Sequence, residues 1–196
     1  MIITRTIILN DEIKKRRVKT YLEIGYGNGE NLKDIKAKSK EAVDPFAPPE
    51  GSTHGKIHNM TSDAFFEQYK GSVDMIFIDG DHSYQQAGKD LESALKHINK
   101  GGIVVMHDTC PKDFNYSTEG WCGGVYRVIS DLANSSKRLA WWTIKEDHGV
   151  TFIKRALQPN KPTGLTIETF EQWDEHKELI MNFKSYEAVD TDLHNI

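Results

Sequence analysis

The chain has 196 residues, with 25 Lys and Arg against 29 Asp and Glu, which gives a formal net charge of −4. A chain of this length can bury roughly 70% of the surface that its unfolded form exposes, which is enough for one domain with its own core. Hydrophobic residues at 38% and charged residues at 28% are close to the globular average, so an intrinsically disordered chain is excluded. The mild acidity also excludes the positive field that a dedicated nucleic-acid binder needs.

No stretch of the sequence reaches the roughly 18 uninterrupted apolar residues of a membrane span. Arg5 interrupts the apolar residues near the start, which argues against a signal peptide. Two cysteines, Cys110 and Cys122, are too few for a disulfide scaffold and predict free thiols in a reducing cytoplasm. The basic run from Lys14 to Lys19 is interpreted as a solvated helix face. We therefore expect a cytoplasmic protein with neither a membrane nor a nucleic acid as its partner.

Short apolar runs alternate with longer amphipathic stretches along the chain, which is typical of a parallel sheet covered by helices. In chain order, the predicted strands cover residues 20–24, 41–43, 56–60, 73–78, 103–106, 139–144 and 150–153. Predicted helices follow at 30–38, after a cap at Ser62, at 84–99 and around 125–132. Gly101 and Gly102 are expected to close the helix that precedes the fifth strand. The last two strands are expected to form an antiparallel pair.

These elements predict an α/β fold, with a doubly wound, mostly parallel, Rossmann-like sheet of seven strands. The sheet domain is expected to span residues 1–157. Pro159, Pro162 and Gly164 indicate a linker, so residues 158–196 are expected to form a helical tail with one amphipathic helix. Three interpretations of this tail remain open: a cap over the sheet domain, a cover for a sheet edge, or the contact of a homodimer.

Polar residues follow nearly every predicted strand, where ligands bind in an open parallel sheet. These residues are Glu23 and the glycines after it, Asp44, Ser62 with Asp63, Asp79, and His107 with Asp108. Turn formation and helix capping explain any one such residue, but turns do not require an acid at each strand end. The set therefore indicates a binding site at this edge of the sheet.

The glycine loop between the first strand and helix runs from Glu23 to Gly29. A GxGxxG dinucleotide fingerprint would place its third glycine at position 30, where this chain has Glu30. Glu23 and Glu30 bring negative charge to both ends of the loop, whereas a pyrophosphate needs the bare positive end of a helix. A cationic ligand matches this loop better.

The order Glu23-x-Gly25-x-Gly27-x-Gly29, then Asp44, then Asp79 resembles the class I S-adenosylmethionine-dependent methyltransferases. Two further runs, FIDGDHSY at 77–84 and GGIVVMHD at 101–108, are more specific. They resemble the small bacterial O-methyltransferases related to macrocin and other macrolide-sugar O-methyltransferases. The resemblance extends over residues 18 to 154 and does not include the tail.

The resemblance implies S-adenosylmethionine as the cofactor and assigns a part of it to each strand end. Glu23, Gly25 and Gly27 would line the methionine part, Asp44 the ribose, Ser62 and Asp63 the adenine, and Asp79 the methyl group. Tyr26 and Asn28 are further expected contacts of the cofactor. A sulfonium cation and a ribose diol are suitable partners for these acids.

The resemblance also implies a divalent metal site at Asp79, His107 and Asp108. Oxygen ligands suit Mg²⁺, but an imidazole at His107 would favour Mn²⁺, Fe²⁺ or Zn²⁺, or would act as the general base itself. His82 is the second candidate base. Asp79, His82 and His107 are thus the expected catalytic residues. A mechanism with a bound metal and a mechanism without one both remain open.

The sequence therefore predicts methyl transfer from S-adenosylmethionine to a hydroxyl of a small molecule, a sugar being one candidate. An NAD-dependent oxidoreductase remains an alternative, because Asp44 would also suit an NAD ribose. A Rossmann-like binding module without catalysis is the third interpretation. The loop over residues 109–124, with Trp121, is expected to form either a mobile lid over the acceptor or a plain surface connection.

Overall fold

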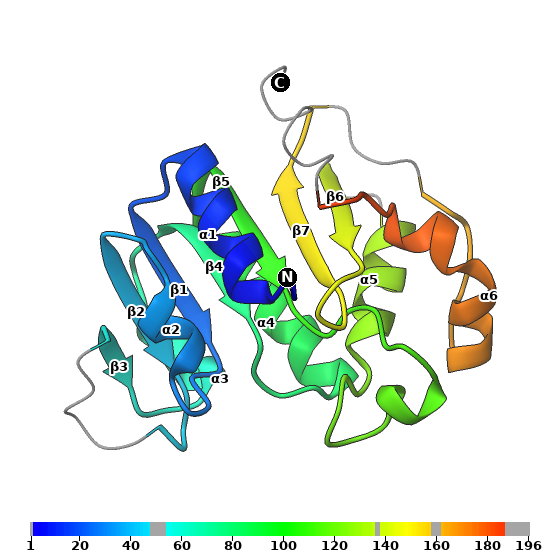
Figure 1. Cartoon of the computed structure of the whole chain (residues 1–196), viewed down its shortest axis with the longest axis horizontal. Coiled ribbons are helices and arrows are strands. Elements are labelled where there is room, and N and C mark those ends of the chain that lie inside the picture. The colour runs from blue at the N-terminus through cyan, green and yellow to red at the C-terminus, as the bar shows by residue number, and fades with distance from the viewer. Residues whose placement is uncertain (1, 48–53, 136–137, 158–161, 187–196) are drawn as a thin grey trace.

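The computed structural model describes residues 2–47, 54–135, 138–157 and 162–186. Seven strands form one sheet in the order β3-β2-β1-β4-β5-β7-β6 (Figure 1). The strands are β1 (Thr20–Ile24), β2 (Ser39–Val43), β3 (Lys56–His58), β4 (Val73–Ile78), β5 (Ile98–Met106), β6 (Leu139–Ile144) and β7 (Val150–Arg155). Only β7 runs antiparallel, to both β5 and β6. This confirms the predicted mostly parallel sheet with its C-terminal antiparallel pair.

Helices cover both faces of the sheet, as Figure 1 shows. They are α1 (Arg5–Arg16), α2 (Glu30–Asp34), α3 (Ser62–Gln68), α4 (Tyr84–His97), α5 (Val125–Asn134) and α6 (Phe170–Met181), with a short 3₁₀ helix at Phe114–Ser117. Two hydrophobic clusters result, one under α1 and α2 and the other under α3 to α6. In β4, Met75 and Phe77 enter the first cluster, whereas Ile76 and Ile78 enter the second. This explains why the sequence of β4 is apolar at every position except Asp74, since both of its faces are buried.

Several predicted boundaries differ from the structure by a few residues, and three of the differences concern residues near the site or the irregular part of β5. The helix after the glycine loop ends at Asp34 instead of residue 38, and the Lys40 ammonium of β2 donates to the carbonyls of Leu32, Lys33 and Ile35 at this end. The cap of α3 is Thr61, whose Oγ1 accepts from the backbone N–H of Ala64 at 3.2 Å. Ser62 is instead the first helical residue.

The third wrong boundary concerns Gly101 and Gly102, which lie inside β5 and do not end a helix. The register between β4 and β5 passes from Val73↔Ile98 directly to Met75↔Ile103. Four residues of β5 therefore stand opposite one residue of β4, which is a wide irregularity in the ladder.

The C-terminal segment packs on the sheet domain. Trp173, Ile180 and Met181 of α6 are fully buried in the same cluster as α5. The predicted boundary at residue 158 and the linker residue Pro159 lie outside the described residues. The separate tail domain, the homodimer contact and the cytoplasmic location stay predictions. Both cysteines are free thiols, and none of the described helices is long and apolar enough to cross a bilayer.

Candidate functional site

A cavity of about 470 Å³ opens at the carboxyl ends of β1, β2 and β4. Its wall consists of the glycine loop, the residues after β2, the start of α3, the turn after β4 and the first turns of α4. Five aspartates line it, at positions 44, 63, 79, 81 and 90, and none of the described lining residues is Lys or Arg. The cavity is thus strongly acidic, although the whole chain carries a net charge of only −4.

The glycine loop lies directly against the turn after β4. Gly25 has a φ of +94°, and a Cβ at this position would be 2.1 Å from the carbonyl oxygen of Asp79. Only glycine combines this backbone conformation with such a close approach. The first and fourth strands can therefore bring their loops together in one cavity wall.

The Asp44 carboxylate holds the glycine loop in place from the end of β2. Its Oδ2 accepts from the backbone N–H groups of Tyr26 at 2.9 Å and Gly27 at 3.1 Å, and its Oδ1 accepts from the N–H of Phe46 at 2.7 Å. Phe46 is 91% exposed beside the cavity. An apolar ring left in solvent next to a cavity is a suitable surface for a planar ligand group.

The start of α3 meets α4 through a polar network that the sequence did not predict. Asp90 is almost fully buried, and its Oδ1 accepts from the Ser62 hydroxyl at 2.6 Å and from Gln86 Nε2 at 3.1 Å. Gln86 Nε2 also donates to Asp63 Oδ1 at 3.0 Å. Burial raises the pKa of Asp90 despite these hydrogen bonds. The sequence signal was present, because Gln86 and Asp90 are four residues apart on one helix face.

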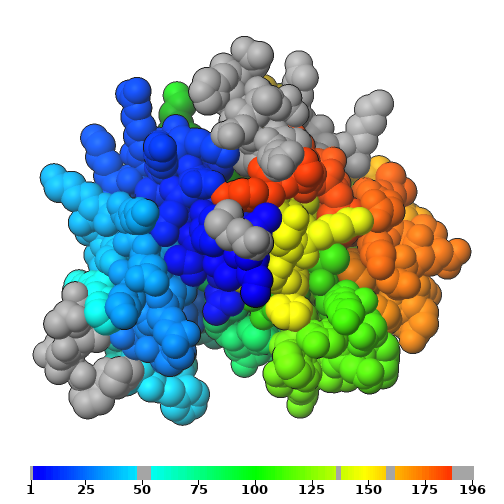
Figure 2. All heavy atoms as spheres, in the orientation of Figure 1, coloured from blue at the N-terminus to red at the C-terminus, as the bar shows by residue number. Residues whose placement is uncertain are grey.

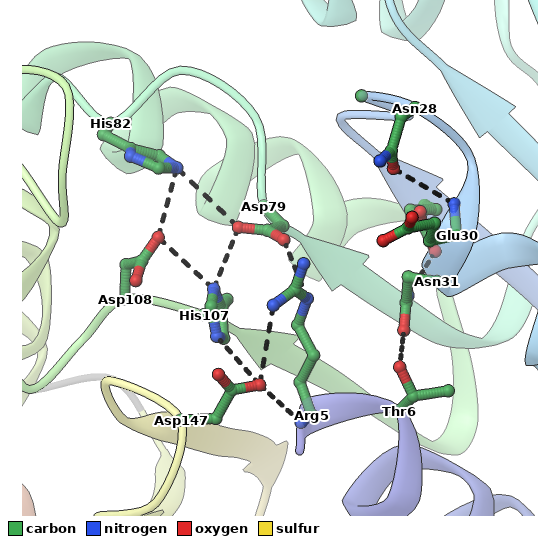
Figure 3. Close-up of polar contacts among 12 residues, drawn as sticks. Arg5, Thr6, Asn28, Glu30, Asn31, Asp79, His82, His107, Asp108 and Asp147 are labelled. Atoms are coloured by element: carbon green, nitrogen blue, oxygen red, sulfur yellow. Dashed lines mark hydrogen bonds and ion pairs between the residues drawn. The ribbon is translucent and has the colours of Figure 1, made fainter.

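Three residues predicted to contact the cofactor lie outside the cavity lining. Glu23 is buried in β1, where its Oε2 accepts from the Tyr21 hydroxyl at 2.6 Å and from Asn31 Nδ2 at 2.7 Å. Burial raises its pKa to about 7. Tyr26 is also buried, and Asn28 Oδ1 accepts from the backbone N–H of Glu30 at 3.2 Å (Figure 3). Glu23 and Tyr26 are thus buried beneath the loop, whereas Asn28 is exposed and contacts the start of α2, and none of the three lines the cavity.

Next to the cavity, a carboxylate–histidine cluster joins six residues: Arg5, Asp79, His82, His107, Asp108 and Asp147 (Figure 3). His107 Nδ1 is 3.0 Å from Asp79 Oδ1 and 3.3 Å from Asp108 Oδ2. His82 Nε2 is 3.3 Å from Asp108 Oδ2 and 3.7 Å from Asp79 Oδ1. Asp79 also lines the cavity, so it connects the two parts of the site.

Opposite charges balance within this cluster. Burial alone would raise the pKa of Asp79, but His107, His82 and Arg5 outweigh it and hold that pKa far below its usual range. Burial likewise disfavours the charged imidazole of His107, but Asp79, Asp108 and Asp147 raise its pKa well above the usual value. The pKa of His82 is also raised, chiefly by its hydrogen bond to Asp79. Both imidazoles therefore hold a proton more strongly than a free imidazole does, and a cation bound at His82 would compete with that proton.

The donor atoms suit a divalent cation, although the grouping differs from the predicted set. One ligand atom each from Asp79, His82 and Asp108 lie within 4.8 Å of one another. His107, which the sequence placed in the metal site, instead faces carboxylates on both ring edges, with Nε2 3.7 Å from Asp147 Oδ2. Two carboxylates and one imidazole fit Mn²⁺, Fe²⁺ or Zn²⁺ better than Mg²⁺.

Arg5 and Asp147 were missed by the sequence analysis. Asp147 Oδ2 accepts from the backbone N–H of Arg5 at 2.6 Å, and Arg5 Nε lies 3.3 Å from Asp79 Oδ2. The two residues are 142 positions apart, and neither belongs to a motif. Only the placement of α1 across the sheet and the turn between β6 and β7 brings them to the cluster.

The loop after β5 covers the other side of the cluster. The carbonyl of Trp121 contacts His82 Nδ1, and Cys122 Sγ lies 3.4 Å from Asp108 Oδ1. Tyr116 of this loop stacks on His148, with ring centroids 5.2 Å apart. The Trp121 side chain is 53% exposed. The lid hypothesis for this loop stays a hypothesis.

The fold belongs to a class of known structures that includes many methyltransferases. A putative caffeoyl-CoA O-methyltransferase from Staphylococcus aureus is similar, with 16% identity, a TM-score of 0.62, and coverage of 80% of this chain and 86% of that chain. An O-methyltransferase from Bacillus cereus, solved in complex with SAH, has 15% identity, a TM-score of 0.56, and coverage of 77% and 81%. The O-methyltransferase TomG from Streptomyces achromogenes, in complex with SAM, has 17% identity, a TM-score of 0.56, and coverage of 78% and 79%. At these identities the likeness shows the fold.

Part of the chain matches a known family by sequence. Residues 16–109, which are 94 of the 196 residues, match a family model described as a methyltransferase domain. The protein R132 of Acanthamoeba polyphaga mimivirus, which is uncharacterized, is 35% identical over 60 residues. These residues are 31% of this chain and 26% of that protein, so the match extends over about a quarter of that relative.

Proposed function

We propose that the protein is an S-adenosylmethionine-dependent methyltransferase that methylates a hydroxyl oxygen of a small molecule, a sugar being one candidate. The observation that carries this proposal is the acidic cavity, with five aspartates and no Lys or Arg among its described lining residues. A sulfonium cofactor is cationic, whereas the pyrophosphate of NAD is anionic and would be repelled. The complexes of the Bacillus cereus and Streptomyces achromogenes enzymes support this choice.

The cavity offers a partner for each part of the cofactor. In the proposed complex the ribose hydroxyls donate to Asp44, which already orders the glycine loop, and the adenine lies between Phe46 and the polar group of Ser62, Asp63 and Gln86. The methionine part follows Gly25 and Gly27, and the sulfonium lies toward Asp79. The methyl group then faces the carboxylate–histidine cluster, where the acceptor binds.

Methyl transfer from a sulfonium is an in-line displacement, so the protein has to align the two reactants and remove the proton of the hydroxyl. We assign the removal of this proton to His82, because the His82 side chain is 31% exposed and can reach an acceptor, whereas the His107 side chain is 5% exposed. His107 is then a positioning residue that holds Asp79. A divalent cation held by Asp79, His82 and Asp108 would instead lower the pKa of the acceptor hydroxyl.

Calorimetric titration with S-adenosylmethionine, S-adenosylhomocysteine and NAD tests the cofactor. We expect saturable heat with both sulfur compounds and none with NAD. Heat with NAD alone would establish the oxidoreductase alternative. If both sulfur compounds bind, formation of S-adenosylhomocysteine in the presence of hydroxyl-bearing small molecules identifies the acceptor. Binding without turnover on any acceptor would favour the non-catalytic module.

A further inference from the structure

A second pocket, of about 240 Å³, lies at the opposite end of the sheet, at the amino ends of the parallel strands. It is lined by the end of α1, the turn into β1, the start of β4 and the irregular part of β5. In Figure 1 the end of α1 lies at the upper left of the molecule, whereas β1 and β4 point toward the bottom, and Figure 2 shows this blue segment on the surface at the upper left. Five residues of β1 separate this pocket from the glycine loop, a distance of roughly 15 Å. It is therefore distinct from the acidic cavity.

Four cationic side chains line this basic pocket: Arg16, Arg17, Lys19 and Lys100. Arg17, Lys19 and Lys100 are exposed, and among the described residues their side chains form no ion pair or hydrogen bond. Arg16 Nε donates to a Glu12 oxygen at 2.6 Å, but its Nη2 is shielded from solvent and has no hydrogen-bond partner. Cations in one concave site without an acidic partner favour an anionic ligand.

The single acidic residue in the lining, Asp74, is engaged elsewhere. Its Oδ2 accepts from the backbone N–H groups of Lys19 at 2.9 Å and Thr20 at 3.0 Å, and from Thr20 Oγ1 at 3.0 Å. Its Oδ1 accepts from Asn99 Nδ2 at 2.8 Å. Asp74 therefore fixes the backbone at the pocket and, among the described residues, three of the four cationic side chains are left without an ion pair or a hydrogen bond.

The backbone of β5 departs from the ladder at this pocket. Residues 99–102 of β5 stand opposite Asp74 alone, and this irregularity carries Lys100 to the pocket. A Cβ on Gly102 would be 2.7 Å from the carbonyl oxygen of Asp74, so glycine is required there. Irregularities of this kind commonly redirect a side chain toward a functional position.

We propose that the basic pocket binds a phosphate group of a small phosphorylated ligand. A phosphate dianion would satisfy several of the unpartnered cations and would offer oxygen acceptors to Arg16. A single concave pocket on a chain of net charge −4 suits a compact ligand and not a nucleic acid, which needs an extended basic surface. The pocket is separate from the site of methyl transfer, so its ligand is not the proposed cofactor.

Calorimetric titration with inorganic phosphate, pyrophosphate and glycerol 3-phosphate, at constant ionic strength set with chloride, tests this proposal. We expect saturable binding of at least one of these probes. The double variant Lys19→Gln/Lys100→Gln and the single variant Arg17→Gln should each weaken it at least tenfold, as expected for the loss of charge-assisted contacts. Lys14→Gln is the matched control, because Lys14 is exposed on the same helix end but does not line the pocket. This control should retain the affinity of the unmodified protein.

Three results would overturn the proposal. Lack of saturable binding for all three probes would do so, as would an equal loss in Lys14→Gln and in the pocket variants, which would indicate a diffuse field. Single-stranded RNA and vesicles containing anionic lipid serve as further ligands in the same experiment. Binding of either one that the three small phosphates do not displace would show a macromolecular surface and would also refute the proposed site.

Discussion

Replacing Glu23 with Gln should change how the stability of the protein depends on pH. Glu23 is 1% exposed, and burial raises its pKa from 4.5 to about 7. The folded protein therefore keeps a proton at pH values where the unfolded chain has lost it. The stabilisation by this proton is complete below about pH 4.5 and is lost as the pH rises through about 7. A difference of about 2.5 in pKa corresponds to about 3 kcal/mol in the free energy of unfolding.

Glu23→Gln cannot ionise but keeps an acceptor oxygen for Tyr21 and Asn31. Its free energy of unfolding, measured by urea titration with far-UV circular dichroism from pH 4.5 to 8, should lack this loss. Relative to the unmodified protein, the variant should gain about 3 kcal/mol in stability over that range. Glu67→Gln, on the exposed surface of α3, is the control for losing a carboxylate. Parallel curves for Glu23→Gln and the unmodified protein would refute the account of Glu23.

Three further predictions concern the cavity and the cluster. Gly25→Ala should abolish cofactor binding and lower the melting temperature, because its Cβ would collide with the Asp79 carbonyl. The control Gly88→Ala, which has open space around the new Cβ, should do neither. Equal melting curves for Gly25→Ala and the unmodified protein would contradict the collision. Asp44→Asn loses the charge and one of the two acceptor oxygens of Asp44, which accept from the glycine loop and from Phe46, and should weaken S-adenosylmethionine binding about tenfold by calorimetry. Unchanged affinity would place the ribose elsewhere. If a metal serves the reaction, a chelator should stop turnover and Mn²⁺ should restore it better than Mg²⁺, since His82 supplies a nitrogen ligand; rates indifferent to chelator and metal would rule this out.

The sheet and the strand ends could be predicted because their signals are local. The apolar run of β4 ends abruptly at Asp79. This local pattern is enough to place the Asp79 carboxylate at the edge of the sheet where the parallel strands have their carboxyl ends. The same reasoning placed Asp44, Ser62 and Asp63 on the cavity, and the structure brings them together there. The same reasoning could not show that the Glu23 side chain is directed into the core. The pattern of a strand does not distinguish an acid buried in the core from an acid that faces the cavity.

The rest of the site depends on contacts between distant parts of the chain. Arg5 and Asp147 reach the cluster only through the crossing of α1 and the hairpin of β6 and β7. The choice between His82 and His107 as partner of the two aspartates depends on side-chain directions that no spacing specifies. The basic run near residue 16 was interpreted as a solvated face, since its partner Lys100 comes from an irregularity in β5 that glycines alone do not predict.

A crystal structure of the protein with S-adenosylhomocysteine tests the central claim most directly. We predict density for the ligand in the acidic cavity, with its ribose at Asp44, its adenine beside Phe46 and its sulfur directed past Asp79 toward His82. A ligand bound elsewhere, or one in the cavity with its sulfur directed away from Asp79, would contradict the proposed site of methyl transfer.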